Sequence, residues 1–396
     1  MKKILSLGIL LLASGMPLLA QTYAIRGETV HTMNGEAIRD GVVLVKDGKI
    51  ERVGPASRVS IPSGYAVTTA KVVTPGFIDA HTVVGLAGYL NQTHDQDQLD
   101  RSSAFQPELR ALDAYNPREV LVEHLRVHGV TTIHTGHGPG ALASGQTMIV
   151  KTTGETLQEA LVDSVHSVAF TLGTSVSGNF TNPGSRSRMM AMLRAEFLKA
   201  QEYAKKESKT RDLRMEILAD VLSGKVNAMI TAHRATEIQS ALRLQKEFGF
   251  NLLLDGASEA YLMLDEIKAA KVTVIVHPAM MRPVGEAGNA TMELAAILHK
   301  NGIPFVFQSG FEGYVPKTRV VHFEAAVAAA NGLPVDATLR ALTIHAATFL
   351  GIQDRVGSLE VGKDADIALF NGDPLEYLTH TTAVMINGKW VSTEAR

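Results

Sequence analysis

Apolar and polar residues alternate along both ends of the chain. From Tyr23 to about Ala70, short alternating stretches are separated by frequent turn signals, and Asp47-Gly48 between two of them is typical of a tight hairpin. The stretches 365–370 and 383–391 show the same alternation. Because successive side chains of a strand point to opposite faces, this pattern predicts half-buried β-strands at both ends.

The middle of the chain follows a different rhythm. Apolar stretches of strand length alternate there with longer helical patterns, of which 187–206 is the clearest. This alternation is typical of repeated βα units and predicts an α/β fold, in which eight parallel strands close into a (β/α)8 TIM barrel. The predicted strands are 72–80, 130–135, 147–151, 167–172, 228–232, 251–254, 272–276 and 305–307. In such a barrel, a functional site lies at the C-terminal ends of the strands.

The composition of the chain excludes some kinds of binding partner and metal site. The 396 residues carry a formal net charge of −2 and include no cysteine. A chain of this charge offers no basic stripe, so no nucleic-acid partner is expected. The absence of cysteine excludes disulfides and thiolate metal ligands.

Residues 1–20 have the composition of a cleavable signal peptide. Lys2 and Lys3 precede an apolar run at 4–12, and small and apolar residues then lead to Ala20. The apolar run is shorter than the roughly 20 residues that a membrane span needs. We therefore expect no membrane span, cleavage after Ala20, and a periplasmic or secreted protein.

The segment 74–83 is the most informative part of the sequence. It reads Thr-Pro-Gly-Phe-Ile-Asp-Ala-His-Thr-Val, with His81 at the end of a short apolar strand and Val83 two residues later. This segment resembles the first barrel strand of the amidohydrolase superfamily, and the nearest group is the imidazolonepropionase-like, metal-dependent amidohydrolases. In that family the strand ends in a His-x-His pair, whose two imidazoles point the same way and can hold one zinc ion. Here Val83 stands in place of the second histidine and offers no lone pair.

The resemblance covers most of the chain and implies a composite architecture. Residues 357–366 closely match a late motif of the family. The family fold implies a TIM barrel over residues 71–356. It also implies a small β-sandwich domain that both chain ends build together, from residues 22–70 plus 357–396.

The resemblance also allows each metal-ligand position of the family to be checked in this sequence. His233 stands in the family's Ala-His-Arg-Ala pattern on strand five and survives together with His81. The lysine of strand four is replaced by Ala169, the histidine of strand six by Gly256 and the aspartate of strand eight by Gly310. Two histidines alone do not fix a metal or polarise a water molecule. The expected cofactor is therefore at most one divalent metal, zinc, weakly bound or absent.

Other metal-binding side chains lie near the same strand ends. His277 follows strand seven, Asp255 ends strand six, and His134 and His137 lie at the end of strand two. One interpretation is a relocated metal site, for which His277, Asp255 and His137 are the candidate ligands beside the two surviving histidines. The other is a pocket of inherited polar residues that hydrogen-bond to one another.

Three functions remain open on the sequence alone. The family activity is metal-dependent hydrolysis of C–N bonds in non-peptide amides, cyclic amides or dipeptide-like molecules. Because most ligand positions are lost, we expect a catalytically impaired binding or partner subunit with a small-molecule ligand. The alternatives are an active hydrolase with a relocated metal site, and a structural subunit that assembles with an intact paralogue. A homo-oligomer and a hetero-oligomer with a related amidohydrolase both fit these readings.

Overall fold

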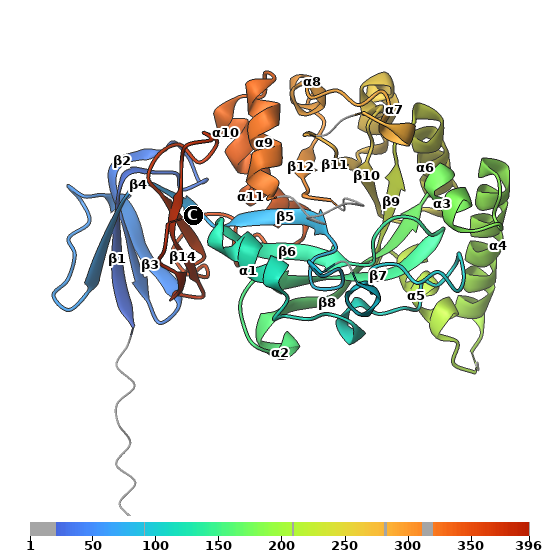
Figure 1. Ribbon diagram of the computed structural model, residues 1–396, viewed down its shortest axis with the longest axis horizontal. Helices are drawn as coiled ribbons and strands as arrows, with labels where there is room; N and C mark the ends of the chain where they lie inside the picture. The colour runs from blue at the N-terminus through green and yellow to red at the C-terminus, as the bar shows by residue number, and fades with distance from the viewer. Residues whose placement is uncertain (1–20, 91, 208–209, 281–282, 311–319, 396) are drawn as a thin grey trace, which may run out of the picture.

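The computed structural model describes residues 21–90, 92–207, 210–280, 283–310 and 320–395. The expected signal peptide, residues 1–20, lies outside this part of the chain. The described residues form two β-sheets, a seven-stranded sheet and an eight-stranded sheet (Figure 1).

Strands from both chain ends build the seven-stranded sheet. In spatial order they are β15 (Lys389–Ser392), β14 (Thr381–Ile386), β13 (Ile367–Phe370), β4 (Ala66–Pro75), β1 (Thr22–Val30), β2 (Ile38–Lys46) and β3 (Lys49–Pro55). The two ends meet at β4, which pairs in parallel with β1 and antiparallel with β13. At the far edge, Lys49 of β3 bridges to Asp364, so the sheet curls back toward the C-terminal segment. The predicted domain shared by both chain ends is confirmed.

The predicted hairpin between β2 and β3 is also present. Asp47 and Gly48 connect the pair Lys46 and Lys49, and their φ angles are +51° and +82°. Positive φ at both central residues is the geometry of the tight turn that Asp-Gly favours.

The eight predicted barrel strands are all present in the second sheet. They are β5 (Phe77–Thr82), β6 (Val130–Gly136), β7 (Ala143–Lys151), β8 (Leu161–Thr171), β9 (Asn227–Ala232), β10 (Leu252–Gly256), β11 (Thr273–Val276) and β12 (Phe305–Phe307). They neighbour one another in chain order, and a bridge between Thr82 and Gly310 brings the two edges together. The predicted TIM-barrel fold with a small terminal domain is confirmed.

Two details of the strand prediction are wrong. The predicted strand 72–80 is divided, because β4 ends at Pro75 in the small sheet and β5 begins at Phe77 in the barrel. In addition, β7 runs antiparallel to both β6 and β8. Only six residues separate β6 from β7, and a parallel pair needs a crossover of about a dozen residues or more.

The reversed direction of β7 places Lys151 at the end of the barrel near the small domain. Its ammonium group lies 2.8 Å from Asp364 Oδ2 and 3.1 Å from Asp366, and its side chain is 3% exposed. Asn387 also accepts a hydrogen bond from it. A buried ion cluster therefore connects the barrel to the small domain.

Helices surround the barrel sheet (Figure 1). They are α1 (Val120–Val127), α2 (Leu157–Ala160), α3 (Thr174–Asn179), α4 (Arg186–Lys205), α5 (Leu213–Leu222), α6 (Ala235–Phe248), α7 (Leu264–Ala270), α8 (Leu294–Lys300), α9 (Val321–Ala330), α10 (Val335–Ala341) and α11 (Ile344–Phe349). The helix predicted at 187–206 is α4, whose N-cap Ser185 accepts a hydrogen bond from the Arg188 amide. Within the described residues, no helix is both long and apolar enough to cross a membrane.

An apolar layer fills the barrel interior. It contains inward-facing residues from seven of the eight strands, namely Ile78, Ala80, Ile149, Ala169, Met229, Leu253, Ile275 and Val306, and all are buried. Because side chains alternate along a strand, the residue two positions further along a parallel strand enters the same interior. Those residues are Thr231 on β9, Asp255 on β10, His277 directly after β11 and Gln308 directly after β12, and they form the polar layer from which the candidate site is built.

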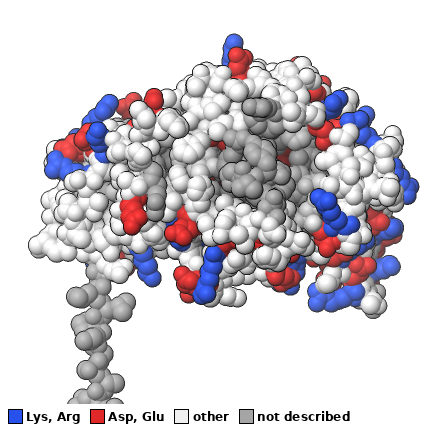
Figure 2. Space-filling view, viewed as in Figure 1, with Lys and Arg blue, Asp and Glu red and all other residues white. Residues whose placement is uncertain are grey.

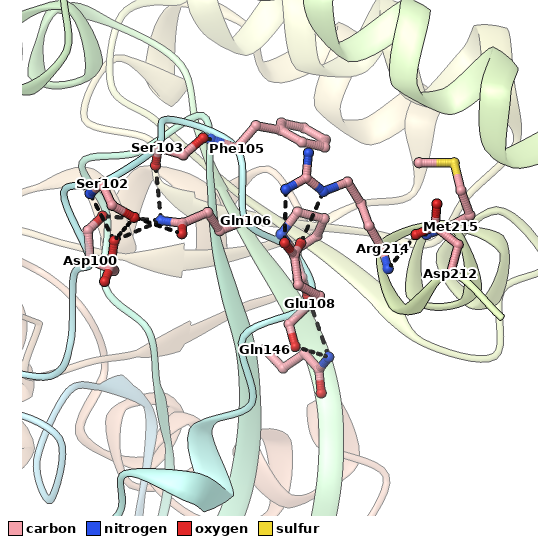
Figure 3. A network of polar contacts seen from close by, with 11 residues as sticks. Asp100, Ser102, Ser103, Phe105, Gln106, Glu108, Gln146, Asp212, Arg214 and Met215 are labelled. Carbon is pink, nitrogen blue, oxygen red and sulfur yellow. Dashed lines mark hydrogen bonds and ion pairs between the residues drawn. The ribbon is translucent and has the colours of Figure 1, made fainter.

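The long connection between β5 and α1 packs against β7 and α5. Glu108 accepts two hydrogen bonds from Arg214, at 2.8 and 3.2 Å, and the Arg214 guanidinium lies 5.9 Å from the centre of the Phe105 ring (Figure 3). Earlier in the connection, Asp100 accepts hydrogen bonds from Ser102 and Gln106. These contacts fix the connection beside the barrel mouth. On the face shown in Figure 2, basic and acidic side chains are interspersed, so this face offers no continuous basic surface.

Candidate functional site

A cavity of about 550 Å³ opens at the C-terminal ends of the parallel barrel strands. Its described lining residues are His81, Val83, Leu99, Arg101, Pro139, Gly140, Thr174, Ser175, Asn179, Thr231, His233, Asp255, Gly256, His277, Pro278, Val284, Glu286, Ala287, Gln308 and Gly310. Of the candidates from the sequence, His81, His233, Asp255 and His277 therefore meet at one cavity, whereas His137 does not line it.

Asp255 is the centre of a buried hydrogen-bond network. Its Oδ1 lies 3.0 Å from His81 Nδ1 and accepts a 2.6 Å hydrogen bond from Gln308 Nε2. Its Oδ2 accepts a 2.6 Å hydrogen bond from the Thr231 hydroxyl. Burial alone would raise the pKa of Asp255, but the charge of His81 and the hydrogen bonds from His81 and Thr231 lower that pKa to about 2. Both oxygens of this carboxylate are thus committed to neighbouring side chains.

His81 is held from two sides. Its backbone amide donates to Asp79 Oδ1 at 3.3 Å, and its ring nitrogen Nδ1 is bound to Asp255. Burial lowers the pKa of His81, but the charge and hydrogen bond of Asp255, together with Asp79 and Gln308, outweigh that effect and raise the pKa. Its other ring nitrogen, Nε2, is buried and has no hydrogen-bond partner within the described part of the chain.

His233 packs directly against Gly256. Its Nδ1 lies 2.7 Å from the Ser258 hydroxyl, and burial lowers the pKa of the imidazole. Gly256 has a φ of +76°, and a Cβ placed on it would lie 2.6 Å from His233 Cε1. A side chain at position 256 would therefore overlap the present ring of His233 and adopt an unfavourable backbone conformation.

His277 has the same relationship to Gly310. The φ of Gly310 is +68°, and a Cβ placed there would lie 2.6 Å from His277 Nε2. The positions where the family resemblance expects a histidine and an aspartate are thus occupied by glycines whose missing side chains leave room for His233 and His277.

The histidines of β6 and the following loop are engaged in contacts away from the cavity. Both ring nitrogens of His134 have partners, the Ala80 carbonyl at 2.8 Å and the Thr147 hydroxyl at 2.6 Å. His137 Nδ1 donates to the Gln146 carbonyl at 2.9 Å, and the ring packs against Gly145. Burial lowers the pKa of both histidines.

Ala169 lies in the apolar layer of the barrel, below the polar network. It is 3% exposed and belongs to the same buried cluster as Ile149 and Met229. The position that the resemblance assigns to a metal-bridging lysine is therefore part of a tightly packed apolar core.

Comparison with known proteins identifies the family to which this chain belongs. A family model described as "Amidohydrolase family" matches residues 72–391, which is most of the chain. The chain belongs to the amidohydrolase family. Members of this family are hydrolases that act on C–N bonds, and they are generally metal-dependent.

Individual relatives agree with this assignment. The chain is 24% identical over 410 residues to imidazolonepropionase of Sphingopyxis alaskensis, covering 87% of this chain and 91% of that protein. It is 22% identical to "Amidohydrolase tasK" of Hapsidospora irregularis, covering 94% of this chain but 43% of that longer protein. The structure of an amidohydrolase from Thermotoga maritima MSB8 superimposes with a TM-score of 0.88 and 28% identity, covering 94% of this chain and 100% of that one. The predicted superfamily is confirmed.

Because the family is generally metal-dependent, it matters which side chains of this cavity could bind a metal ion. Among the described residues, no group of three or more histidine, aspartate or glutamate side chains is placed to hold a metal ion. Asp255 is saturated by three donors, His81 and His233 each commit Nδ1 to a neighbour, and Val83 has no donor atom. His81 Nε2 is buried without a hydrogen-bond partner among the described residues. The residues of this amidohydrolase cavity do not fit the family's metal centre.

Several residues of the network were not predicted as site residues from the sequence. Thr231 and Gln308 saturate Asp255, and Ser258 fixes His233. Thr231 lies two positions before His233, and Gln308 two positions before Gly310, so the period of two along each strand was the available signal. Arg101 enters the cavity from a loop and Glu286 from a short 3-10 helix (Gly285–Ala287), and neither has such a periodicity.

Proposed function

We propose that this amidohydrolase-family protein is catalytically impaired and binds a small molecule in the cavity at the barrel mouth. One observation carries this proposal. The glycines at 256 and 310 leave space that the rings of His233 and His277 fill, while both oxygens of Asp255 are bound by side-chain donors. Hydrogen bonds between side chains thus occupy the region where hydrolytic relatives need metal ligands.

Hydrolysis by a bound metal needs more than this cavity supplies. A catalytic zinc site uses three protein ligands with an open position for water, and a neighbouring group must accept the proton of that water. Among the described residues, no group of three or more histidine and carboxylate side chains is placed to hold a metal ion. Asp255 is the one buried carboxylate of the described lining, and its low pKa and three hydrogen bonds make it a poor proton acceptor.

The cavity itself supports a binding role. Its volume of about 550 Å³ lies within the range of small-molecule sites, roughly 300–1,000 Å³. Its wall combines apolar residues such as Val83 and Leu99 with polar groups from the ends of five strands and from the segments between them. Such a mixed wall suits a small organic ligand.

The proposal is tested by metal content and turnover measured on the same preparation. Protein purified without chelator is analysed by inductively coupled plasma mass spectrometry and assayed with dipeptides and cyclic amides, with and without added zinc. We expect far less than one metal ion per chain and no product above the background of heat-inactivated protein. A full equivalent of zinc together with turnover that His277→Ala abolishes would overturn the proposal in favour of a relocated metal site.

We also propose that the protein is exported. The support is the composition of residues 1–20, where a basic start is followed by a short apolar run and by small residues before Gln21. Mass spectrometry of periplasmic and cytoplasmic fractions is the test. A mature N-terminus at or near Gln21 in the periplasm is expected, and soluble cytoplasmic protein that retains Met1 would contradict export.

A further inference from the structure

Two carboxylates belong to the described lining of the cavity, and both are already matched by donors within the protein. Asp255 accepts hydrogen bonds from three side chains. Glu286 accepts hydrogen bonds from the backbone amides of Thr174 and Ser175 at the start of α3. Neither carboxylate is therefore left to bind a cationic ligand.

Arg101, by contrast, has no matching acceptor among the described residues. Its side chain lines the cavity, and it forms no ion pair or side-chain hydrogen bond with any residue that the structure describes. The adjacent Asp100 is turned away, because its Oδ1 accepts from the Ser102 amide at 2.8 Å, the Ser102 hydroxyl at 2.5 Å and Gln106 Nε2 at 3.1 Å (Figure 3). The cavity thus carries one positive charge that its own described wall does not compensate.

The backbone that carries Arg101 is fixed on both sides. Before it, the Gln98 carbonyl accepts a 2.9 Å hydrogen bond from the Gly138 amide. After it, the Ala104 carbonyl accepts a 3.1 Å hydrogen bond from the Ala143 amide. Because the loop is already ordered against β7, a ligand that binds the guanidinium does not have to order the loop first.

The cavity also contains a second polar group that can bind a ligand, the ring of His81. His81 is 2% exposed and lines the cavity, and its Nε2 is buried without a partner among the described residues. A buried polar atom without a partner is costly, so a ligand that hydrogen-bonds to it gains affinity.

We propose that the cavity binds a small organic carboxylate, with Arg101 binding the carboxylate group and a second polar group of the same molecule hydrogen-bonded to His81 Nε2. A guanidinium presents paired N–H donors that match the two oxygens of a carboxylate. This inference rests on the proposed binding function and specifies the chemical class of its ligand.

Pairs of acids and their uncharged amides provide the test. The full-length mature protein is screened by thermal shift and then by calorimetry against hydroxy acids, dicarboxylates and N-acetyl amino acids, each beside its primary amide. We expect at least one acid to bind and its amide to bind at least tenfold more weakly. Arg101→Gln is expected to weaken binding of that acid at least tenfold, and Arg101→Lys to weaken it less.

Arg110→Gln is the matched control, because Arg110 belongs to the same connection but pairs with Asp113 at 3.4 Å and does not line the cavity. It is expected to bind the acid as the wild type does. The inference is overturned if no acid of the panel binds, if the amides bind as tightly as the acids, or if Arg101→Gln binds unchanged. Hydrolysis of the amides by zinc-loaded protein would instead overturn the proposed function, and product formation distinguishes the two failures.

Discussion

The ring of His277 occupies the space that a side chain at Gly310 would need. A Cβ on Gly310 would lie 2.6 Å from His277 Nε2, and the φ of +68° adds a conformational cost for any other residue. The same relationship links His233 to Gly256. Both glycines, where the family resemblance expects donor residues, are thus packed against histidine rings.

Gly310→Ala should therefore destabilise the protein. The left-handed conformation costs a non-glycine residue about 1–2 kcal/mol, and overpacking adds roughly 1–3 kcal/mol. Gly249→Ala is the matched control, because Gly249 has a φ of +79° but no atom within 4 Å of its Cβ position. Urea unfolding should show a larger loss for Gly310→Ala than for the control, and equal losses would mean that His277 does not oppose a side chain there.

Asp255→Asn should weaken the fold even though it changes few atoms. The amide places a donor against one of three existing donors and removes the charge opposite His81. We expect these two changes to lower the free energy of unfolding by about 2–4 kcal/mol. Asp336→Asn is the control, since Asp336 forms an exposed pair with Arg340 that is worth less than about 1 kcal/mol. The two free energies of unfolding are compared at neutral pH, and a loss at Asp255 as small as that of the control would argue against the network.

Much of the fold could be predicted from the sequence. Apolar stretches alternating with helical patterns mark the eight barrel strands, the period of two marks the strands at the chain ends, and the family resemblance implies that both ends share one domain. The direction of β7 could not be predicted, since the predicted strands 130–135 and 147–151 left eleven residues between them. The extension of β7 back to Ala143, which shortens the connection, comes from pairing with β8, and no local pattern shows it.

The candidate site was predictable only in part. The positions His81, Asp255, His233 and His277 could be placed at one rim, because each stands at the C-terminal end of a parallel strand. The packing at positions 256 and 310 could not be predicted. Whether a glycine is a lost donor or the space for a neighbouring ring depends on contacts between different strands.

The ion cluster between the barrel and the small domain should govern acid stability. Burial alone would raise the pKa of Asp364, but hydrogen bonds from Lys151 and Lys49 lower it to about 2 from 3.8. The folded state therefore holds this carboxylate charged more strongly than the unfolded chain does. Its contribution is present above the unfolded pKa and is lost as the pH falls through the folded value.

Lys151→Met tests that cluster. Removing the buried ammonium leaves Asp364 and Asp366 without their common partner, and we expect a loss of roughly 3–5 kcal/mol at pH 7. The variant should also lose less stability than the wild type between about pH 4 and pH 2. Lys205→Met, which breaks an exposed pair with Glu202, is the control. Parallel acid-unfolding curves for Lys151→Met and the wild type would contradict the role of the cluster.

Restoring the family's donors should return metal affinity at a cost in stability. The combined variant Val83→His, Gly256→His and Gly310→Asp supplies three donors beside His81 and His233, but it forces the rings of His233 and His277 to move. We expect tighter zinc binding than in the wild type and a lower denaturation midpoint. A restored variant as stable as the wild type would show that the two glycines do not hold space for the histidines.

Calorimetric titration of zinc into chelator-treated wild-type protein shows whether the cavity binds a metal ion. Within the described residues no three histidine or carboxylate side chains are placed to hold a metal ion, and both oxygens of Asp255 accept hydrogen bonds. We predict no zinc binding at the cavity and no change on His81→Gln or His277→Ala. Micromolar or tighter binding of one zinc per chain, lost in either variant, would contradict the account and restore a metal site to this protein.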